Sequence, residues 1–162
     1  AGEWIMIKTT LFAGGCFWGM EASFQQVPGV VATQVGYAGG ITENPTYREV
    51  CCGETGHAET VQVTYDTDQI SYQELLKAFF TSHDPTTADP NGCDFGSQYR
   101  SIVFYNDDEE RKIARRMISR LTRTQEIGCI ICTELTPTAV FYPAEDYHQQ
   151  YYQRHGLLSD SD

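Results

Sequence analysis

A cysteine set between glycines and aromatic residues is the part of this sequence best suited to chemistry. Cys16 follows Gly14-Gly15 and precedes Phe17-Trp18, where a strand-like apolar stretch ends and a helix-like pattern begins. Unpaired amide groups and the helix dipole at a helix N-terminus favour the thiolate, which is the reactive form of cysteine. The glycines allow a tight turn that leaves the sulfur uncovered, and the aromatic rings can build an apolar wall beside it. The pattern therefore predicts a nucleophilic thiol.

Hydrophobic periodicity predicts the elements that position this thiol. Strands are expected at 5–12, 30–35, 59–65, 99–105 and 130–135, and helices at 16–26, 71–82, 107–123 and 144–154. A capping box from Ser71 to Glu74 opens the second of these helices. The order β-α-β-β-α-β, followed by α-β, predicts an α+β fold, a two-layer α/β sandwich with a ferredoxin-like (split βαβ) core. The polar stretches 37–57 and 83–98 are too long for simple connections, so we expect them to be functional loops.

Length and composition indicate one globular unit. We expect residues 1–162 to form a single domain, with a disordered tail from about residue 155. The formal net charge of -11 argues against nucleic acid as a partner, because phosphate binding requires clustered Lys and Arg. No apolar run approaches the roughly 18 residues of a membrane span, and the start shows no signal-peptide pattern. We therefore expect a cytoplasmic monomer, with a removed targeting segment left open by the start at Ala1.

The cysteines do not have the spacing of a disulfide scaffold or a metal site. The chain has 6 of them, irregularly placed, and is rich enough in core residues to fold with reduced thiols. Cys129 and Cys132 form a C-x-x-C pair, a pattern found in redox motifs and zinc half-sites. Because the pair overlaps a predicted strand, where residues three apart point to opposite faces, we interpret it as structural core. A redox pair and a zinc half-site stay as alternatives, and no metal site is expected.

Further motifs follow the Gly15–Gly19 segment in a fixed order. Six blocks lie at residues 36–40, 44–51, 56–59, 83–85, 94–101 and 144–151. Together these motifs resemble the peptide methionine sulfoxide reductase A family, over about residues 8 to 156. The number and order of the blocks make the resemblance far more specific than the cysteine motif alone.

The resemblance implies a thiol-dependent oxidoreductase that reduces methionine S-sulfoxide, free or in proteins, to methionine. Cys16 would attack the sulfoxide sulfur, while Phe17 and Trp18 would hold the substrate methyl group. Glu59 would be a protonated acid that binds the sulfoxide oxygen and delivers a proton to it. The polar oxygen site would be completed by Tyr47, Tyr99 and Asp94.

These residue types suit that reaction. A sulfoxide sulfur is a poor electrophile until its oxygen is protonated. Desolvation beside an aromatic wall raises the pKa of a carboxylic acid, which then stays protonated near neutral pH. Tyrosine hydroxyls can donate to the same oxygen without adding charge. The attack would leave Cys16 as a sulfenic acid and release methionine.

The chain departs from the family in its recycling step. Many members carry resolving cysteines in a C-terminal tail, whereas this chain has none after Cys132. Three routes are open: resolution by Cys93, resolution by Cys51 or Cys52, or direct reduction by an external thiol. Thioredoxin, glutaredoxin with glutathione, or dithiothreitol would supply that thiol, and no bound cofactor is expected.

Other polar residues of these motifs are expected to have structural roles. We interpret His57 and His83 as loop-stabilising, and Glu21 as facing the surface of its helix or making a local ion pair. His148 and Tyr151 are expected to pack the C-terminal segment.

Two other classes of function are weighed against the reductase. A thiol peroxidase or general disulfide oxidoreductase would consume peroxide or reduce insulin, but the sequence lacks a redox C-x-x-C at a helix start. A catalytically silent module would only bind oxidised or apolar peptides. The presence of Cys16, Glu59 and the polar residues of the oxygen site argues against that silence.

Overall fold

The computed structural model describes residues 6–83, 85, 97–124 and 131–156. These residues form a 6-stranded sheet in the order β5-β4-β1-β3-β2-β6. The strands are β1 Ile7–Ala13, β2 Val30–Ala38, β3 Ala58–Asp66, β4 Ile102–Tyr105, β5 Glu134–Pro137 and β6 Tyr142–Pro143. The helices are α1 Phe17–Gln25, α2 Tyr47–Cys51, α3 Tyr72–Ser82, α4 Asp108–Arg123 and α5 Tyr151–Arg154, with 3-10 turns at Ser97–Tyr99 and Asp146–His148.

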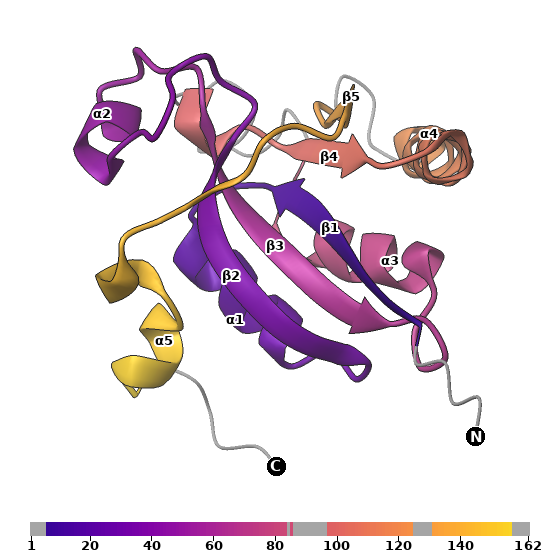
Figure 1. The fold of residues 1–162 in the computed structure, drawn as a ribbon. Helices are drawn as coiled ribbons and strands as arrows, with labels where there is room; N and C mark the ends of the chain where they lie inside the picture. The colour runs from indigo at the N-terminus through magenta and orange to yellow at the C-terminus, as the bar shows by residue number, and fades with distance from the viewer. Residues whose placement is uncertain (1–5, 84, 86–96, 125–130, 157–162) are drawn as a thin grey trace.

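Two β-α-β units interleave in this sheet. Strand β3 lies between β1 and β2 and is antiparallel to both, while β4 is antiparallel to β1 and parallel to β5. Helices α1 and α3 contact each other and cover one face of the sheet (Figure 1). The mixed sheet with packed helices confirms the predicted α+β class.

The helix starts follow their capping residues. Ser71 and Glu74 form the predicted capping box at the start of α3, and Asp107 caps α4 by accepting from the Glu110 amide at 2.8 Å. Such caps satisfy amide groups that have no partner within the helix.

Stacked aromatic rings fill the space between the sheet and the helices. The fully buried Phe12 on β1 stacks on Phe24, Tyr72 and Phe79, with centroid distances of 5.2, 6.3 and 5.0 Å. These rings come from β1, α1 and α3, so their packing fixes the helices on the strand that leads to Cys16.

Phe12→Ala is expected to lower the free energy of unfolding by about 3–5 kcal/mol, because it removes three ring contacts and leaves a cavity. Urea unfolding followed by circular dichroism measures the loss. Ile7→Ala on the same strand is the matched control, since Ile7 is 44% exposed and its loss should stay near 0.5 kcal/mol, about the usual surface value. Equal losses in the two variants would contradict this account of the core.

The regions 37–57 and 130–135 differ from the sequence expectations. The stretch 37–57, predicted to be irregular, contains the short helix α2, which Thr46 and Glu49 open with a second capping box. The strand predicted at 130–135 is instead β5, which begins at Glu134. The α2 signal was hidden because the helix has only 5 residues and lies in a polar stretch.

Cys132 differs from the expectation that the cysteines are reduced. It precedes β5 and is disulfide-bonded. Its backbone N–H donates to the carbonyl of Pro85 at 2.7 Å. The expectation of reduced thiols is therefore wrong for Cys132. The interpretation of the pair as structural core stays a prediction, because Cys129 lies outside the described residues.

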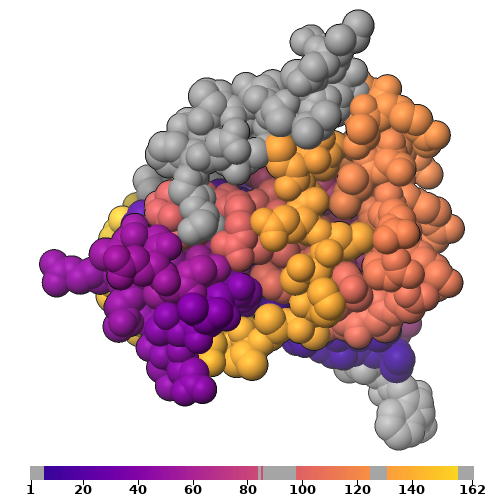
Figure 2. Space-filling model, turned by 90° about the horizontal axis from the view of Figure 1, so that it is seen from above, coloured from indigo at the N-terminus to yellow at the C-terminus, as the bar shows by residue number. Residues whose placement is uncertain are grey.

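The chain after β5 crosses from one edge of the sheet to the opposite edge, and then reaches the start of α1. Strand β6 pairs with β2, placing Tyr142 opposite Tyr37, and the Tyr142 ring contacts His57 with centroids 5.5 Å apart. Figure 2 shows this orange segment lying against the purple residues that connect β2 and β3. The predicted helix 144–154 is divided into a 3-10 turn and α5, with Gln150 between them at φ 50°.

Residues 157–162 of the predicted disordered tail lie outside the described residues. None of the helices in the described ranges has the length and apolar character needed to cross a membrane.

Candidate active site

The thiol lies at the N-terminal end of α1, directly after the turn that follows β1. Cys16 is the exposed N-cap residue of α1, in an extended backbone conformation. Gly15 before it has φ +74°, a left-handed conformation that residues with a Cβ atom rarely adopt. The backbone N–H of Gly15 donates to the carbonyl of Tyr99 at 3.0 Å, which fixes this turn against the 3-10 turn. The predicted place of the thiol at a helix start is confirmed.

Its predicted acidity is not confirmed. Desolvation raises the pKa of the Cys16 thiol above its ordinary value and outweighs the amides of Trp18 and Gly19, which lower it. The negative charge of Glu59 raises the pKa further. The thiol forms no capping hydrogen bond, so the helix start alone does not produce a resting thiolate. The sequence reasoning counted the helix amides, which do lower the pKa, but not the desolvation and the charge of Glu59, which raise it.

Glu59 is the acidic partner of this helix end. It lies on β3, is 2% exposed, and its Oε1 accepts the backbone N–H of Phe17 at 3.1 Å. Glu59 thereby satisfies the first amide of α1, which Cys16 leaves without a side-chain cap. Desolvation raises the pKa of Glu59 to about 7, against the lowering effect of the Phe17 amide. A carboxyl group that exchanges its proton near neutral pH is thus fixed to the same turn of helix as the thiol.

Tyr47 and Tyr99 both lie within the electrostatic influence of Glu59. Burial raises the pKa of Tyr47 and of Tyr99, and the charge of Glu59 raises both further. Tyr99 also interacts electrostatically with Cys16. Both phenols are therefore protonated donors at neutral pH.

The aromatic residues beside the thiol lie at different depths. Phe17 is buried, with its ring centroid 5.8 Å from that of Tyr37 and 6.3 Å from that of Tyr47. Trp18 is half-buried, and its centroid lies 6.4 Å from that of Phe17. The predicted apolar wall therefore adjoins the ring of Tyr47, whereas Asp94, predicted to complete the polar site, lies outside the described residues.

Comparison with known proteins places this site in a family. The sequence model described as peptide methionine sulfoxide reductase matches residues 8–159. The chain is 51% identical over 149 residues to "Peptide methionine sulfoxide reductase MsrA" of Sulfolobus acidocaldarius, covering 92% of this chain and 84% of that one. The chain belongs to the peptide methionine sulfoxide reductase family. This membership confirms the resemblance seen in the sequence and makes the protein an oxidoreductase.

Solved structures agree with this family assignment. The reduced form of Mxr1 from Saccharomyces cerevisiae superposes with a TM-score of 0.81 at 34% identity, covering 93% of this chain and 86% of that one. A second Mxr1 structure is a complex with Trx2, with a TM-score of 0.61 at 26% identity, covering 90% of this chain and 84% of that one. The fold is therefore that of the solved Mxr1 structures.

Two residues that contact Trp18 in this reductase were expected only to pack the C-terminal segment. The indole Nε1–H of Trp18 donates to His148 Nδ1 at 2.9 Å, and the Tyr151 ring stacks on the indole with centroids 3.8 Å apart. Burial lowers the pKa of His148, so the ring is neutral and its Nδ1 can accept. A half-buried indole N–H requires an acceptor. Trp18 was therefore the feature of the sequence that could have indicated such a partner.

Glu145 is another residue of the reductase that sequence reasoning missed. One of its carboxylate oxygens accepts the Tyr37 hydroxyl at 2.9 Å, and the other accepts the Tyr47 amide at 3.0 Å. The segment after β6 therefore fixes α2, and with it the Tyr47 side chain, against the sheet.

The candidate resolving cysteines differ in their surroundings. Cys51 ends α2 and Cys52 is its C-cap residue, and both are exposed. The thiol of Cys51 interacts electrostatically with Tyr47. Cys93 lies outside the described residues. In the part of the reductase that the structure describes, no group of three or more His, Cys, Asp or Glu side chains could hold a metal ion.

Proposed function

We propose that this protein reduces methionine S-sulfoxide, free or in peptides, with Cys16 as nucleophile and Glu59 as acid. The observation that carries the proposal is the shared helix end. Glu59 binds the amide of Phe17, the residue directly after Cys16, and its pKa lies at about 7. The acid and the thiol are thus held together where a sulfoxide can contact both.

The surrounding side chains support one orientation of the substrate. The methyl group would lie against Phe17 and Trp18, and the oxygen would point toward Glu59, Tyr47 and Tyr99. Protonated Glu59 donates a proton to the oxygen while the Cys16 sulfur forms a bond to the sulfoxide sulfur. Loss of methionine then transfers the oxygen to Cys16 as a sulfenic acid, so the thiol is oxidised by two electrons and the sulfoxide is reduced by two.

The sulfenic acid must then be reduced. A structure of the relative Mxr1 with Trx2 supports thioredoxin as the reductant of this protein. An internal thiol would first form a disulfide and release water. The electrostatic interaction of Cys51 with Tyr47 and Glu59 favours Cys51 over Cys52 for this step. Intact mass after one turnover without reductant distinguishes the routes. Loss of two hydrogens indicates an internal disulfide, and gain of one oxygen indicates a sulfenic acid that awaits an external thiol.

Turnover of the two methionine sulfoxide epimers with dithiothreitol tests the proposed function. Reduction of the S epimer is expected, because the methyl pocket and the oxygen donors lie in a fixed arrangement around the sulfur. Equal turnover of the R epimer would contradict the proposal. Hydrogen peroxide serves as the comparison substrate, and peroxide consumption without sulfoxide reduction would favour a thiol peroxidase.

A further inference from the structure

We propose that Glu21 is a positioning residue that fastens the segment 144–156 to α1 and thereby orients the indole of Trp18. The proposal rests on the proposed function, in which Trp18 contacts the substrate. Glu21 was expected on the surface of its helix, yet it is only 1% exposed. A buried carboxylate is costly unless hydrogen bonds compensate for its lost hydration, so its contacts show what it holds.

Every polar contact of the Glu21 carboxylate is with a donor. Oε1 accepts the backbone N–H of Gln150 at 2.9 Å, and Oε2 accepts Gln150 Nε2 at 3.0 Å. Oε2 also accepts the hydroxyl of Thr33 at 2.8 Å, which in turn accepts Gln25 Nε2 at 3.4 Å. This last bond directs the Thr33 proton toward Glu21. The carboxylate therefore joins α1 to β2 and to residue 150 at once.

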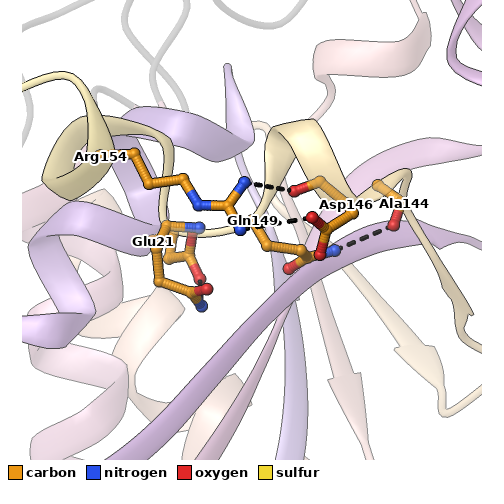
Figure 3. Close-up of polar contacts among 6 residues, drawn as sticks. Glu21, Ala144, Asp146, Gln149 and Arg154 are labelled. Atoms are coloured by element: carbon orange, nitrogen blue, oxygen red, sulfur yellow. Dashed lines mark hydrogen bonds and ion pairs between the residues drawn. The ribbon is translucent and has the colours of Figure 1, made fainter.

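Residue 150 is where the segment needs such support. Gln150 has φ 50°, a left-handed conformation that is unfavourable for a residue with a side chain. Its neighbour Gln149 is fixed independently, because its side chain accepts from the Val35 amide and donates to the Val35 carbonyl, both at 2.9 Å. Figure 3 shows Gln149 also bonded to Ala144, close to Glu21. Glu21 thus holds the turn that follows this anchor.

The fastened turn lies between the two residues that contact the indole. His148 accepts the Trp18 N–H before the turn, and Tyr151 stacks on the indole after it, with ring planes 7° apart. Glu21 and Trp18 stand three residues apart on α1, so one helix face carries both the indole and the carboxylate that holds its neighbours. Without Glu21, the bond of residue 150 to α1 is lost and Tyr151 is no longer held over the indole.

Glu21→Ala tests the proposal through two readouts. We expect KM for methionine sulfoxide to rise roughly five- to tenfold with a smaller change in kcat, since the indole is a binding surface that loses a stacking partner. We also expect the emission of Trp18 to shift to longer wavelength as the indole gains water contact. The emission is measured in a Trp4→Phe background, because the sequence contains 2 tryptophans.

Two further variants separate positioning from general destabilisation. Glu21→Gln keeps an amide oxygen for the Gln150 N–H and is expected to restore most of the KM and emission. Glu74→Ala removes an exposed capping-box residue of α3, far along the chain from the segment, and is expected to lower stability without changing either readout. A KM rise of the same size in Glu74→Ala would overturn the proposal.

The outcome stays decisive if Glu21→Ala does not fold. Gln150→Ala removes one of the three donors from the carboxylate, and we expect a smaller KM rise with the same direction of emission shift. Wild-type KM and emission in Gln150→Ala, or in a folded Glu21→Ala, would overturn the positioning role. A wild-type protein that reduces no sulfoxide would overturn the proposed function instead, while the emission readout would still test the fastening.

Discussion

Replacing Cys16 with serine is expected to reduce sulfoxide turnover to the rate seen without enzyme while the protein stays folded. The sulfur of Cys16 supplies the two electrons that reduce the substrate, and it ends as a sulfenic acid. A serine hydroxyl has no equivalent two-electron oxidation, so better positioning cannot compensate for the change. The effect is measured as the rate at which methionine is released from the S epimer in the presence of dithiothreitol.

The stability of the same variant should move in the opposite direction. Cys16 is the N-cap residue of α1 but makes no capping hydrogen bond, and it is exposed. Serine is among the best N-cap residues. The free energy of unfolding of Cys16→Ser should therefore be higher than that of the wild type by up to about 1 kcal/mol. Cys16→Ala is the matched control, which should be inactive without this gain. Sulfoxide reduction by either variant would show that another group is the nucleophile.

The sequence signals that succeeded are local ones. The strand-to-helix change at Cys16 and the capping box at Ser71 depend on residues within a few positions of each other. Glu59 was predicted as an acid with a raised pKa from its family resemblance, and the structure supplies the cause, which is burial against the helix end. Such local patterns depend on neighbouring residues, so they can be predicted before the fold is known.

The signals that failed depend on contacts between distant residues. Glu21 resembles a surface residue until Thr33 and Gln150, 12 and 129 positions away, are folded around it. The stacking of Tyr151 on Trp18 likewise requires β6 to bring the C-terminal segment to α1. The acidity of Cys16 was misjudged for the same reason, because its desolvation arises from tertiary packing. No periodicity in the chain encodes these distances.

Glu59→Gln is expected to slow the first turnover by about 10²–10⁴-fold, the usual contribution of a positioned general acid. Glutamine keeps an oxygen for the Phe17 N–H, so the helix start should hold while the transferable proton is lost. Single-turnover methionine release at pH 7 measures the effect. A rate like that of the wild type would remove Glu59 from the acid role and leave Tyr47 or Tyr99 as the proton donor.

The pH profile of the wild type should report the two groups as a coupled pair. The reacting pair holds one proton, because the acid must be protonated and the thiol ionised. The rate should therefore rise with pH up to about 7, where the pair loses its first proton, and should fall only above the raised pKa of Cys16. In Glu59→Gln the alkaline fall should vanish, since only the thiolate then titrates. A wild-type rate that falls through pH 7 would mean that the reacting pair keeps both protons.

The same ionisation sets the effect of Glu59→Gln on stability. The pKa of Glu59 is raised from 4.5 to about 7 by folding, so its contribution to stability is complete below pH 4.5 and is lost as the pH rises through 7. Glutamine does not ionise and escapes this loss. At pH 8 the free energy of unfolding of the variant should thus be roughly 3 kcal/mol higher than that of the wild type, with little difference at pH 4. Urea unfolding at the two pH values measures this difference. A slower but more stable enzyme at pH 8 would identify Glu59 as a carboxyl group kept buried at a cost in stability because its proton is used in the reaction.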